Sequence, residues 1–469
     1  MASPNTFGEL GLSIIGIGTE YPPHLLDYTC LNILGKRFYS DTPSMQKVLG
    51  INRYTGIDTR SSIGLPDHPS VNKKDAPSIA ELHQIFQSDG IPLAIRAARK
   101  AIDEAKVDTR FITHIVATTC TDSANPGFDH FVAKGLGIAH GVEKVLLHGV
   151  GCSGGLATLR TGANLALGHK ARGMPARVLC VALEVSTTLV RSELDSIHET
   201  QQTRIGACLF SDCGSAVLLS NGIGEPAEPV YDLLGWDHRT IPDTEHDLGF
   251  DVDPVGGFKL FKDLWDDTDT KIGWKVILTT RVPKLTAASI PPAFNDLKAS
   301  LPQLPPDYQN AADFDWAMHP GGATILSGAE RAMDMSPEHM RASYDTYINH
   351  GNSSSATIFS VMNRLRSKDM DALAPGGRVR DYVVGCAFGP GITVEMCMLK
   401  RNMNHGKGVT GLQTPPETPA ETETEPSEVG DGEWGPERSG SRAREDPAST
   451  SQDEYATFVA ESLEHLDLD

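Results

Sequence analysis

The feature that most restricts the fold of this chain is an internal repeat. The first copy consists of THIVATTCT (113–121) and HGVGCSGGLATL (148–159), and the second consists of DWAMHPGGA (315–323) and NHGNSSSATIF (349–359). Each copy has the pattern of a strand, a connection and a glycine-containing turn that opens a helix. Because repeated units of this kind indicate related structural halves, we expect two halves that each present a helix N-terminus.

The spacing within the two copies is the same. Val116 and Cys152 are 36 positions apart in the first copy, and Trp316 and Asn352 are also 36 positions apart in the second. If the halves pack about a pseudo-twofold axis, Cys152 and Asn352 face one another. A chance similarity between two α/β segments is the alternative to a true repeat.

The wider sequence pattern indicates the fold class. Apolar runs rich in Val and Ile alternate with longer segments of helical periodicity, such as residues 91–105 and 156–167. This alternation predicts an α/β architecture with largely buried strands. We expect an N-terminal half over residues 1–225 and a C-terminal half over residues 226–405.

The composition changes sharply after Met403. Residues 406–469 hold 16 acidic and 4 basic residues, a net charge of −12 out of −20 for the whole chain. A segment so rich in Pro, Glu, Thr and Ser buries too little apolar surface to offset its ordering entropy, so we expect it to be mostly disordered. Apolar residues at helical spacing over residues 454–468 suggest a short amphipathic helix that docks on a partner or frays.

Charge, hydropathy and cysteine usage exclude several classes of protein. A formal charge of −20 argues against a nucleic-acid or anionic-membrane partner, because phosphate binding needs clustered Lys and Arg. No apolar run approaches about 18 residues, so no membrane span is expected. The first eight residues lack a secretory signal, which favours a cytoplasmic setting. The eight cysteines include no CxxC pair and no His at zinc-finger spacing, so we expect reduced thiols and no metal site.

Cys152 is the strongest candidate for a nucleophile. It follows an apolar stretch and precedes SGGLATLRTGANLAL, so we expect it in a sharp strand-to-helix turn. Free backbone N–H groups and the helix dipole at such a turn favour the thiolate. The small residues Ser153, Gly154 and Gly155 let a substrate carbonyl approach closely. A buried structural cysteine is the ordinary interpretation of an isolated Cys, and the turn position favours the nucleophile instead.

His319 and Asn352 are the candidate partners of this thiol. His319 ends a strand-like segment and precedes a Pro-Gly-Gly turn, where its ring can pair with a thiolate or donate to an oxyanion. An ordinary hydrogen-bonded histidine is the alternative, and His350 is a weaker competitor. Asn352 is either a helix N-cap or an amide donor beside His319. Two such donors aimed at one point would stabilise an enolate oxygen without a metal, as decarboxylation of a malonyl thioester requires.

Four motifs in one order resemble the chalcone/stilbene synthase family, the type III polyketide synthases. They are VGCSGG with Cys152, HPGGA with His319, GNSSSA with Asn352, and FGPG over residues 388–391. The resemblance implies a thiolase-like αβαβα five-layered fold made of two pseudo-repeated halves. It also implies a homodimer without a cofactor that loads an acyl-CoA onto the cysteine, extends it with malonyl-CoA by decarboxylative Claisen condensation, and cyclises the product.

The resemblance further assigns roles to individual residues. Cys152 would carry the acyl group, while His319 and Asn352 would promote decarboxylation and stabilise the condensation oxyanion. Phe210 matches the gatekeeper between the CoA tunnel and the cavity, and Lys47 and Arg53 lie where the family places cations for CoA phosphates. The remaining positions expected to contact substrate are Cys120, Ser186, Val276, Gly321, Gly322, Ala323, Phe388, Gly389 and Pro390.

Departures from the plant pattern indicate the fungal branch of the family. Ala387 replaces the first glycine of GFGPG, LFSDCG replaces a more glycine-rich turn, and CSGG replaces a bulkier sequence after the cysteine. These features resemble the 2′-oxoalkylresorcylic acid and alkylresorcinol synthases, which implies long-chain fatty acyl-CoA starters. The small side chains of Cys120, Ser186 and Val276 would leave room for an alkyl chain, or they simply fill a core.

Two other functions remain open at this point. A β-ketoacyl-acyl-carrier-protein synthase III also uses Cys, His and Asn, but it needs a basic docking patch that this acidic chain does not obviously offer. A catalytically silent scaffold could retain the fold without the chemistry. The intact Cys152, His319 and Asn352 argue against the scaffold.

Overall fold

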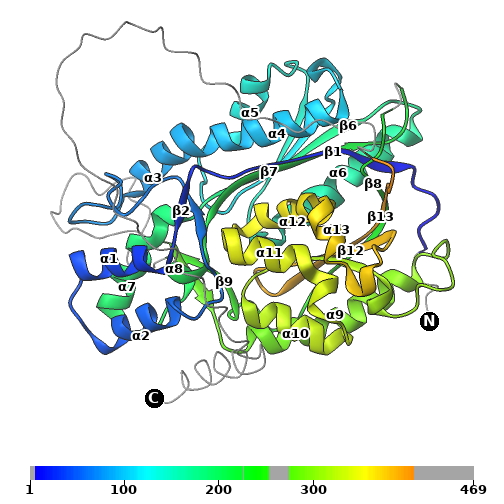
Figure 1. The fold of residues 1–469 in the computed structure, drawn as a ribbon. Coiled ribbons are helices and arrows are strands. Elements are labelled where there is room, and N and C mark those ends of the chain that lie inside the picture. Colours follow the sequence, from blue (N-terminus) through cyan, green and yellow to red (C-terminus); the bar gives the residue numbers. More distant parts are fainter. Residues whose placement is uncertain (1–5, 225–226, 253–273, 406–469) are drawn as a thin grey trace, which may run out of the picture.

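The computed structural model describes residues 6–224, 227–252 and 274–405 of the 469-residue chain (Figure 1). The acidic segment over residues 406–469, including the predicted helix at 454–468, lies outside the described residues.

Within the described residues, nine strands form one mixed sheet in the order β11-β12-β13-β8-β1-β7-β6-β4-β5. Their bounds in that spatial order are Asp315–Met318, Tyr382–Gly389, Thr393–Arg401, Tyr231–Thr240, Leu12–Glu20, Asp212–Ser220, Arg177–Val185, His114–Thr118 and Glu143–Leu147. The sheet therefore draws its strands from both predicted halves of the chain.

The order and directions of these strands repeat about the central β8/β1 pair. Outward from β1, strand β7 is antiparallel to β1, and β6 is antiparallel to β7. Strand β4 comes next and is parallel to β6. Outward from β8, strand β13 is antiparallel to β8, and β12 is antiparallel to β13. Strand β11 comes next and is parallel to β12. Strand β5 extends one edge beyond this symmetry. The predicted pair of pseudo-repeated halves is confirmed, and the repeat relates β4 to β11. The boundary near residue 225 stays a prediction.

Layers of helices alternate with layers of strands, and together they form five layers (Figure 1). The outer helices on the first half are α4 (Ile91–Ala105) and α5 (Phe128–Leu136), and those on the second half are α9 (Val282–Ala299) and α10 (Ala323–Met333). Between them lie α6 (Gly154–Ala171) and α12 (Thr357–Leu365), which contact strands of both halves. This arrangement is the expected αβαβα architecture. The helical periodicity at residues 91–105 corresponds to α4, and that at 156–167 lies within α6.

The two inner helices approach closely because their facing residues are small. A side-chain Cβ on Gly155 would lie 2.4 Å from the Cγ2 atom of Ile358 and 2.7 Å from the carbonyl oxygen of Ser355. Leu156, Leu159 and Ile358 belong to one buried core cluster that joins both halves. The glycines after Cys152 therefore serve helix packing.

Further helices and two small sheets complete the fold beside the nine-stranded sheet. The helices are α1 (Tyr28–Phe38), α2 (Pro43–Asn52), α3 (Ile79–Ile85), α7 (Val190–Thr200), α8 (Gly206–Leu209), α11 (Arg341–His350) and α13 (Lys368–Ala372). Two small two-stranded sheets pair β2 (His24–Leu26) with β3 (Arg60–Ser62) and β9 (Leu248–Val252) with β10 (Trp274–Leu278). Helices α1, α2, α7 and α8 share a separate core cluster, which orients the chain leading from α8 to Phe210.

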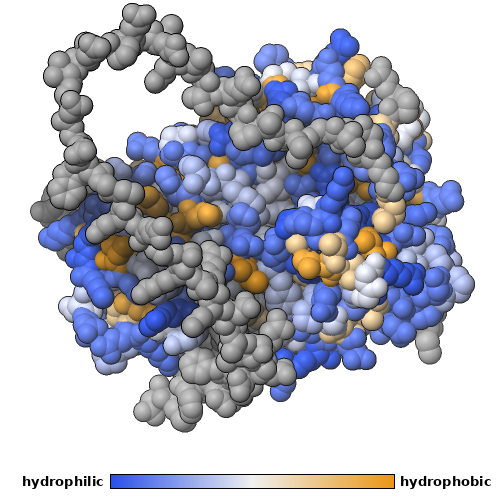
Figure 2. Space-filling model, viewed as in Figure 1, coloured by the Kyte–Doolittle hydropathy of each residue, from blue (hydrophilic) through white to orange (hydrophobic). Residues whose placement is uncertain are grey.

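The surface in Figure 2 is mainly hydrophilic, with apolar residues in small separate groups. Among the described residues, none of the helices combines the length and the apolar character needed to cross a membrane.

Candidate active site

Cys152 lies in a single 3-10 turn, Gly151–Ser153, that leads directly into α6. Gly151 has φ +48°, and a Cβ atom there would lie 2.5 Å from the Cδ atom of Pro390. Only glycine meets both constraints without strain. The predicted strand-to-helix turn is confirmed, and the turn before the cysteine packs on the FGPG segment.

The FGPG segment packs directly against the cysteine turn. A Cβ atom on Gly389 would lie 2.3 Å from the Oγ atom of Ser153 and 2.5 Å from the carbonyl oxygen of Val150. Phe388 is buried in the core cluster of the second half. The structure therefore gives Phe388, Gly389 and Pro390 a packing position, and their predicted contact with substrate stays a prediction.

His319 follows the last residue of β11 and is 2% exposed. Its backbone N–H donates to the carbonyl oxygen of Cys386 at 2.8 Å, which fixes the start of the turn. Neither ring nitrogen has a hydrogen-bond partner within the described part of the chain. Buried polar atoms are normally paired, so an imidazole with two free nitrogens is a candidate for contact with a substrate.

Asn352 connects the His319 turn to the start of the second inner helix. Its side-chain Nδ2 donates to the carbonyl oxygen of Gly321 at 3.2 Å, and its Oδ1 accepts the backbone N–H of Ser354 at 2.8 Å. The backbone of Asn352 also pairs in a parallel bridge with Phe210. The side chain is therefore held between two turns of the second half.

The equal spacing suggested that Cys152 and Asn352 are equivalent, but their positions relative to the inner helices differ by three residues. Helix α6 begins two residues after Cys152, whereas α12 begins five residues after Asn352. Each helix is preceded by a 3-10 turn, Gly151–Ser153 and Ser354–Ala356, so Cys152 lies inside the first turn whereas Asn352 lies two residues before the second. Ser354, the first residue of the second turn, is the residue of the second half that contacts the thiol.

Ser354 was missed as a site residue although it lies within the quoted GNSSSA motif. Its Oγ atom is 3.3 Å from the Sγ atom of Cys152 and 3.4 Å from the Sγ atom of Cys120. Ser354 also has φ +48°, a conformation that is uncommon for a residue with a side chain. Such strain occurs often at functional sites, and here it accompanies a direct contact with the candidate nucleophile.

Glu184 is a second residue that the sequence analysis missed. It is fully buried at the end of β6, where it accepts hydrogen bonds from the backbone N–H of Cys120 at 3.1 Å, from the hydroxyl of Thr121 at 3.0 Å, and from the hydroxyl of Ser355. Burial raises the pKa of Glu184. A carboxyl residue at the end of an otherwise apolar strand is the signal that could have identified it.

The electrostatics of the site differ from the expected thiolate. Cys152 is half-buried, and the loss of solvent around its thiol raises the pKa of Cys152 to about 12. The Ser354 hydroxyl lowers this pKa, and the charge of Glu184 raises it. Burial also lowers the pKa of His319 to about 3. Since no opposite charge compensates for desolvation, both groups are neutral at neutral pH.

A cavity of about 710 Å³ is lined by Gly321 of the His319 turn, but Cys152, His319 and Asn352 are not among its lining residues. We call it the large cavity, and six of its lining residues are Lys47, Ile51, Glu193, Leu209, Val276 and Gly321. The predicted Gly322 and Ala323 also line it. Arg53 does not, because its guanidinium lies 5.4 Å from the centre of the Tyr28 ring instead. The volume of the large cavity is within the usual range of small-molecule sites.

A smaller hollow of about 20 Å³ lies next to this cavity. The small hollow is lined by Cys120, Ser186, Phe210 and Ser354, and it shares Val276 with the large cavity. Four residues that were predicted to contact substrate therefore line the same hollow as Ser354, which contacts Cys152. Val276 stands between the two spaces.

Comparison with known proteins gives a consistent picture. Residues 45–223 match the family model "Chalcone and stilbene synthases, N-terminal domain", and residues 264–403 match the corresponding C-terminal domain. The chain is 38% identical over 395 residues to the acylalkylpyrone synthase csyB of Aspergillus oryzae, which covers 83% of this chain and 94% of that protein.

Solved structures extend the comparison to three dimensions. A type III pentaketide synthase from Neurospora crassa is 66% identical with a TM-score of 0.79, over 84% of this chain and 100% of that one. CsyB in complex with CoA-SH is 37% identical with a TM-score of 0.76, over 83% of this chain and 100% of that one.

Proposed function

The chain belongs to the chalcone and stilbene synthase family and is a type III polyketide synthase, and we propose that it builds its product on the thiol of Cys152. An acyl group is loaded from acyl-CoA, extended with malonyl-CoA and cyclised. The observation that carries this assignment of the site is the contact of the Cys152 thiol with Ser354, whose backbone N–H binds Asn352, while the Asn352 side chain binds Gly321 in the turn after His319.

The loading step transfers an acyl group between two sulfur atoms. The Cys152 sulfur attacks the thioester carbonyl, the new carbon–sulfur bond forms, and the bond to CoA breaks. The neutral His319 accepts the thiol proton and then gives it to the departing CoA sulfur. Because burial lowers the pKa of His319 to about 3, the ring is unprotonated at neutral pH and is a weak base. The thiol proton therefore moves to the ring only as the new carbon–sulfur bond forms.

The extension step forms a carbon–carbon bond. The carboxylate of malonyl-CoA leaves as CO2, and its electron pair remains on the α-carbon as an enolate. The imidazole of His319 and the Nδ2 amide of Asn352 donate hydrogen bonds to the enolate oxygen, and the carbanion then attacks the acyl carbon and releases the Cys152 sulfur. Loss of CO2 supplies the nucleophile, so the cycle uses CoA thioesters and no additional cofactor.

The starter is proposed to be a long-chain fatty acyl-CoA. The pentaketide and acylalkylpyrone synthases among the relatives support an alkylated product, and the large cavity of about 710 Å³ offers the volume for an alkyl chain. The small hollow of about 20 Å³ holds little more than one water. Entry of an acyl chain there therefore requires movement of Phe210 or Val276.

The product is proposed to be a tetraketide or pentaketide that closes to an alkylresorcylic acid, an alkylresorcinol or an alkylpyrone. We further propose a homodimer that works in the cytoplasm. The family assignment does not favour a β-ketoacyl synthase III of fatty-acid synthesis or a catalytically silent scaffold.

The decisive experiment is incubation with a panel of acyl-CoAs, from acetyl-CoA to stearoyl-CoA, and isotopically labelled malonyl-CoA. Mass spectrometry then counts the labelled units in each product. We expect long-chain starters to give products with three or four extensions, and Cys152→Ala to give none. A preference for short or aromatic starters would reject the starter assignment, and full-length product from Cys152→Ala would reject the assigned site.

A further inference from the structure

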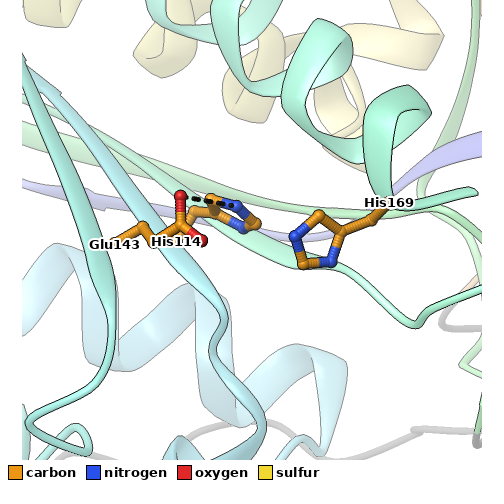
Figure 3. A group of neighbouring side chains, drawn as sticks. All are labelled: His114, Glu143 and His169. Atoms are coloured by element: carbon orange, nitrogen blue, oxygen red, sulfur yellow. Dashed lines mark ion pairs between the residues drawn. The ribbon is translucent and has the colours of Figure 1, made fainter. Parts of the chain in front are cut away.

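Three potential metal ligands meet at the end of the sheet opposite to Cys152. His114 is the first residue of β4, Glu143 is the first residue of β5, and His169 lies in the last turn of α6. One ligand atom of each residue lies within 4.8 Å of the others. Figure 3 shows both imidazoles and the carboxylate pointing toward one another. The residues are 29 and 26 positions apart, so no short motif reveals them.

The hydrogen bonds of His169 leave one ring nitrogen available. Its Nδ1 lies 3.2 Å from the carbonyl oxygen of Pro175. A carbonyl oxygen only accepts, so Nδ1 carries the hydrogen and the lone pair of the neutral ring is on Nε2. In Figure 3 this Nε2 side of the ring faces His114.

His114 has the same arrangement. Its Nδ1 lies 2.8 Å from the Oγ1 atom of Thr113, which also accepts the backbone N–H of Arg177 and can donate to the Arg177 carbonyl, each at 3.0 Å. When the hydroxyl hydrogen goes to that carbonyl, His114 donates from Nδ1 and every group is satisfied. Its Nε2 lone pair then faces the Oε2 atom of Glu143 at 3.7 Å.

We propose that His114, Glu143 and His169 bind a zinc ion through two Nε2 atoms and one carboxylate oxygen. Two imidazoles and a carboxylate are a common ligand set for this metal, and metal-bound histidines usually donate their other ring hydrogen to an oxygen acceptor, as both do here. Zinc ligands at about 2.0–2.2 Å from the metal lie about 3.4 Å apart, so the 3.7 Å pair needs only a small adjustment.

One of the three ligands is exposed to solvent, and the proposed site has one open position. The side chain of Glu143 is 69% exposed on the edge strand, whereas that of His114 is 2% exposed. The carboxylate can therefore close onto a metal already held by the two histidines. A water molecule would complete a tetrahedral shell.

The proposed zinc has a structural role. Helix α6 has 18 residues and separates the two sites, because Cys152 precedes its first turn and His169 lies in its last. At about 1.5 Å per residue the distance is about 25 Å. The metal would join the edge strand β5 to β4 and to the end of α6, and it would take no part in the condensation.

Metal binding is tested on the full-length protein after removal of metals with a chelator. Equilibrium dialysis against Zn²⁺ should give one bound ion per chain for the wild type. Glu143→Gln and His169→Ala should each weaken binding at least tenfold, whereas His140→Gln and Glu9→Gln, which change exposed residues outside the cluster, should not. Zn²⁺ should also raise the thermal midpoint of the wild type but not that of Glu143→Gln.

Co²⁺ distinguishes this site from adventitious binding to the cysteines. Cobalt bound by nitrogen and oxygen ligands gives visible absorption without the intense near-ultraviolet band of thiolate ligation. A thiolate band, the absence of bound Zn²⁺ in the wild type, or unchanged binding in both Glu143→Gln and His169→Ala would overturn the proposal. Polyketide formation should be unchanged in Glu143→Gln, so this test is independent of the proposed function.

Discussion

The Oγ atom of Ser354 lies 3.3 Å from the Sγ atom of Cys152, although the two residues are 202 positions apart and belong to opposite halves of the molecule. Ser354 as a whole is 1% exposed, and its backbone has the strained conformation φ +48°. It is therefore a fixed donor for the sulfur when the sulfur becomes an anion.

Ser354→Ala should slow acylation of the enzyme about tenfold. A hydrogen bond to a charged group contributes about 1.5 kcal/mol, and each 1.36 kcal/mol of barrier is about tenfold in rate. The measurement is single-turnover transfer of a labelled acyl group from acyl-CoA. Ser360→Ala is the matched control, because Ser360 is also buried but contacts Cys213 at 3.5 Å. Equal rates for the wild type and Ser354→Ala would show that the contact does not assist loading.

The rate of alkylation of Cys152 should increase as the pH is raised. Because burial raises the pKa of Cys152 to about 12, the thiolate is a small fraction at neutral pH and grows about tenfold per pH unit. The rate of modification by iodoacetamide should rise in this way from about pH 6 to about pH 9. Peptide mass spectrometry separates Cys152 from the other thiols. A rate that is constant over this range would instead indicate a preformed ion pair with His319.

Cys152→Ala should abolish condensation but retain some decarboxylation of malonyl-CoA, because His319 and Asn352 remain in place. Release of labelled CO2 and formation of polyketide are measured in the same reaction. Cys30→Ala serves as the control, since Cys30 is a half-buried free thiol that lies in α1 rather than at the site. Equal loss of both activities in Cys152→Ala would mean that decarboxylation also needs the thiol.

Asn352→Asp and Asn352→Ala should separate the two roles of this side chain. Both variants lose the Nδ2 donor, which should cost about 3 kcal/mol of barrier by analogy with a single oxyanion-hole group. Asn352→Asp keeps an oxygen for the backbone N–H of Ser354, which Asn352 binds at 2.8 Å. We therefore expect similar losses of decarboxylation but a larger loss of thermal stability in Asn352→Ala. An unchanged decarboxylation rate in either variant would remove Asn352 from the mechanism.

Asp315→Ala should destabilise the second half of the sheet. Asp315 is fully buried in β11, and its two carboxylate oxygens each accept a hydrogen bond from Arg341 at 2.8 Å. Removing one partner of a buried ion pair costs about 3–5 kcal/mol, because the other charge remains in the interior. Urea denaturation measures the loss. Asp67→Ala, which removes the exposed partner of Arg37, should change stability little.

Local sequence patterns determined much of the backbone. The repeat predicted the two halves, because strand and helix periodicity depend on residues only a few positions apart. The glycine before Cys152 indicated the turn, since φ +48° at Gly151 is a local requirement. The spacing of the repeat even matched β4 with β11, which occupy equivalent positions in the sheet.

Only the tertiary structure decided which side chains act on the thiol and in which charge state. Ser354 contacts the thiol of Cys152 and Glu184 binds the backbone of Cys120 because distant strands and turns pack together. The raised pKa of Cys152 and the lowered pKa of His319 come from burial, which is a property of the whole packed interior. Short-range sequence determines backbone conformation, whereas solvation and contacts across hundreds of residues arise only once the layers have packed.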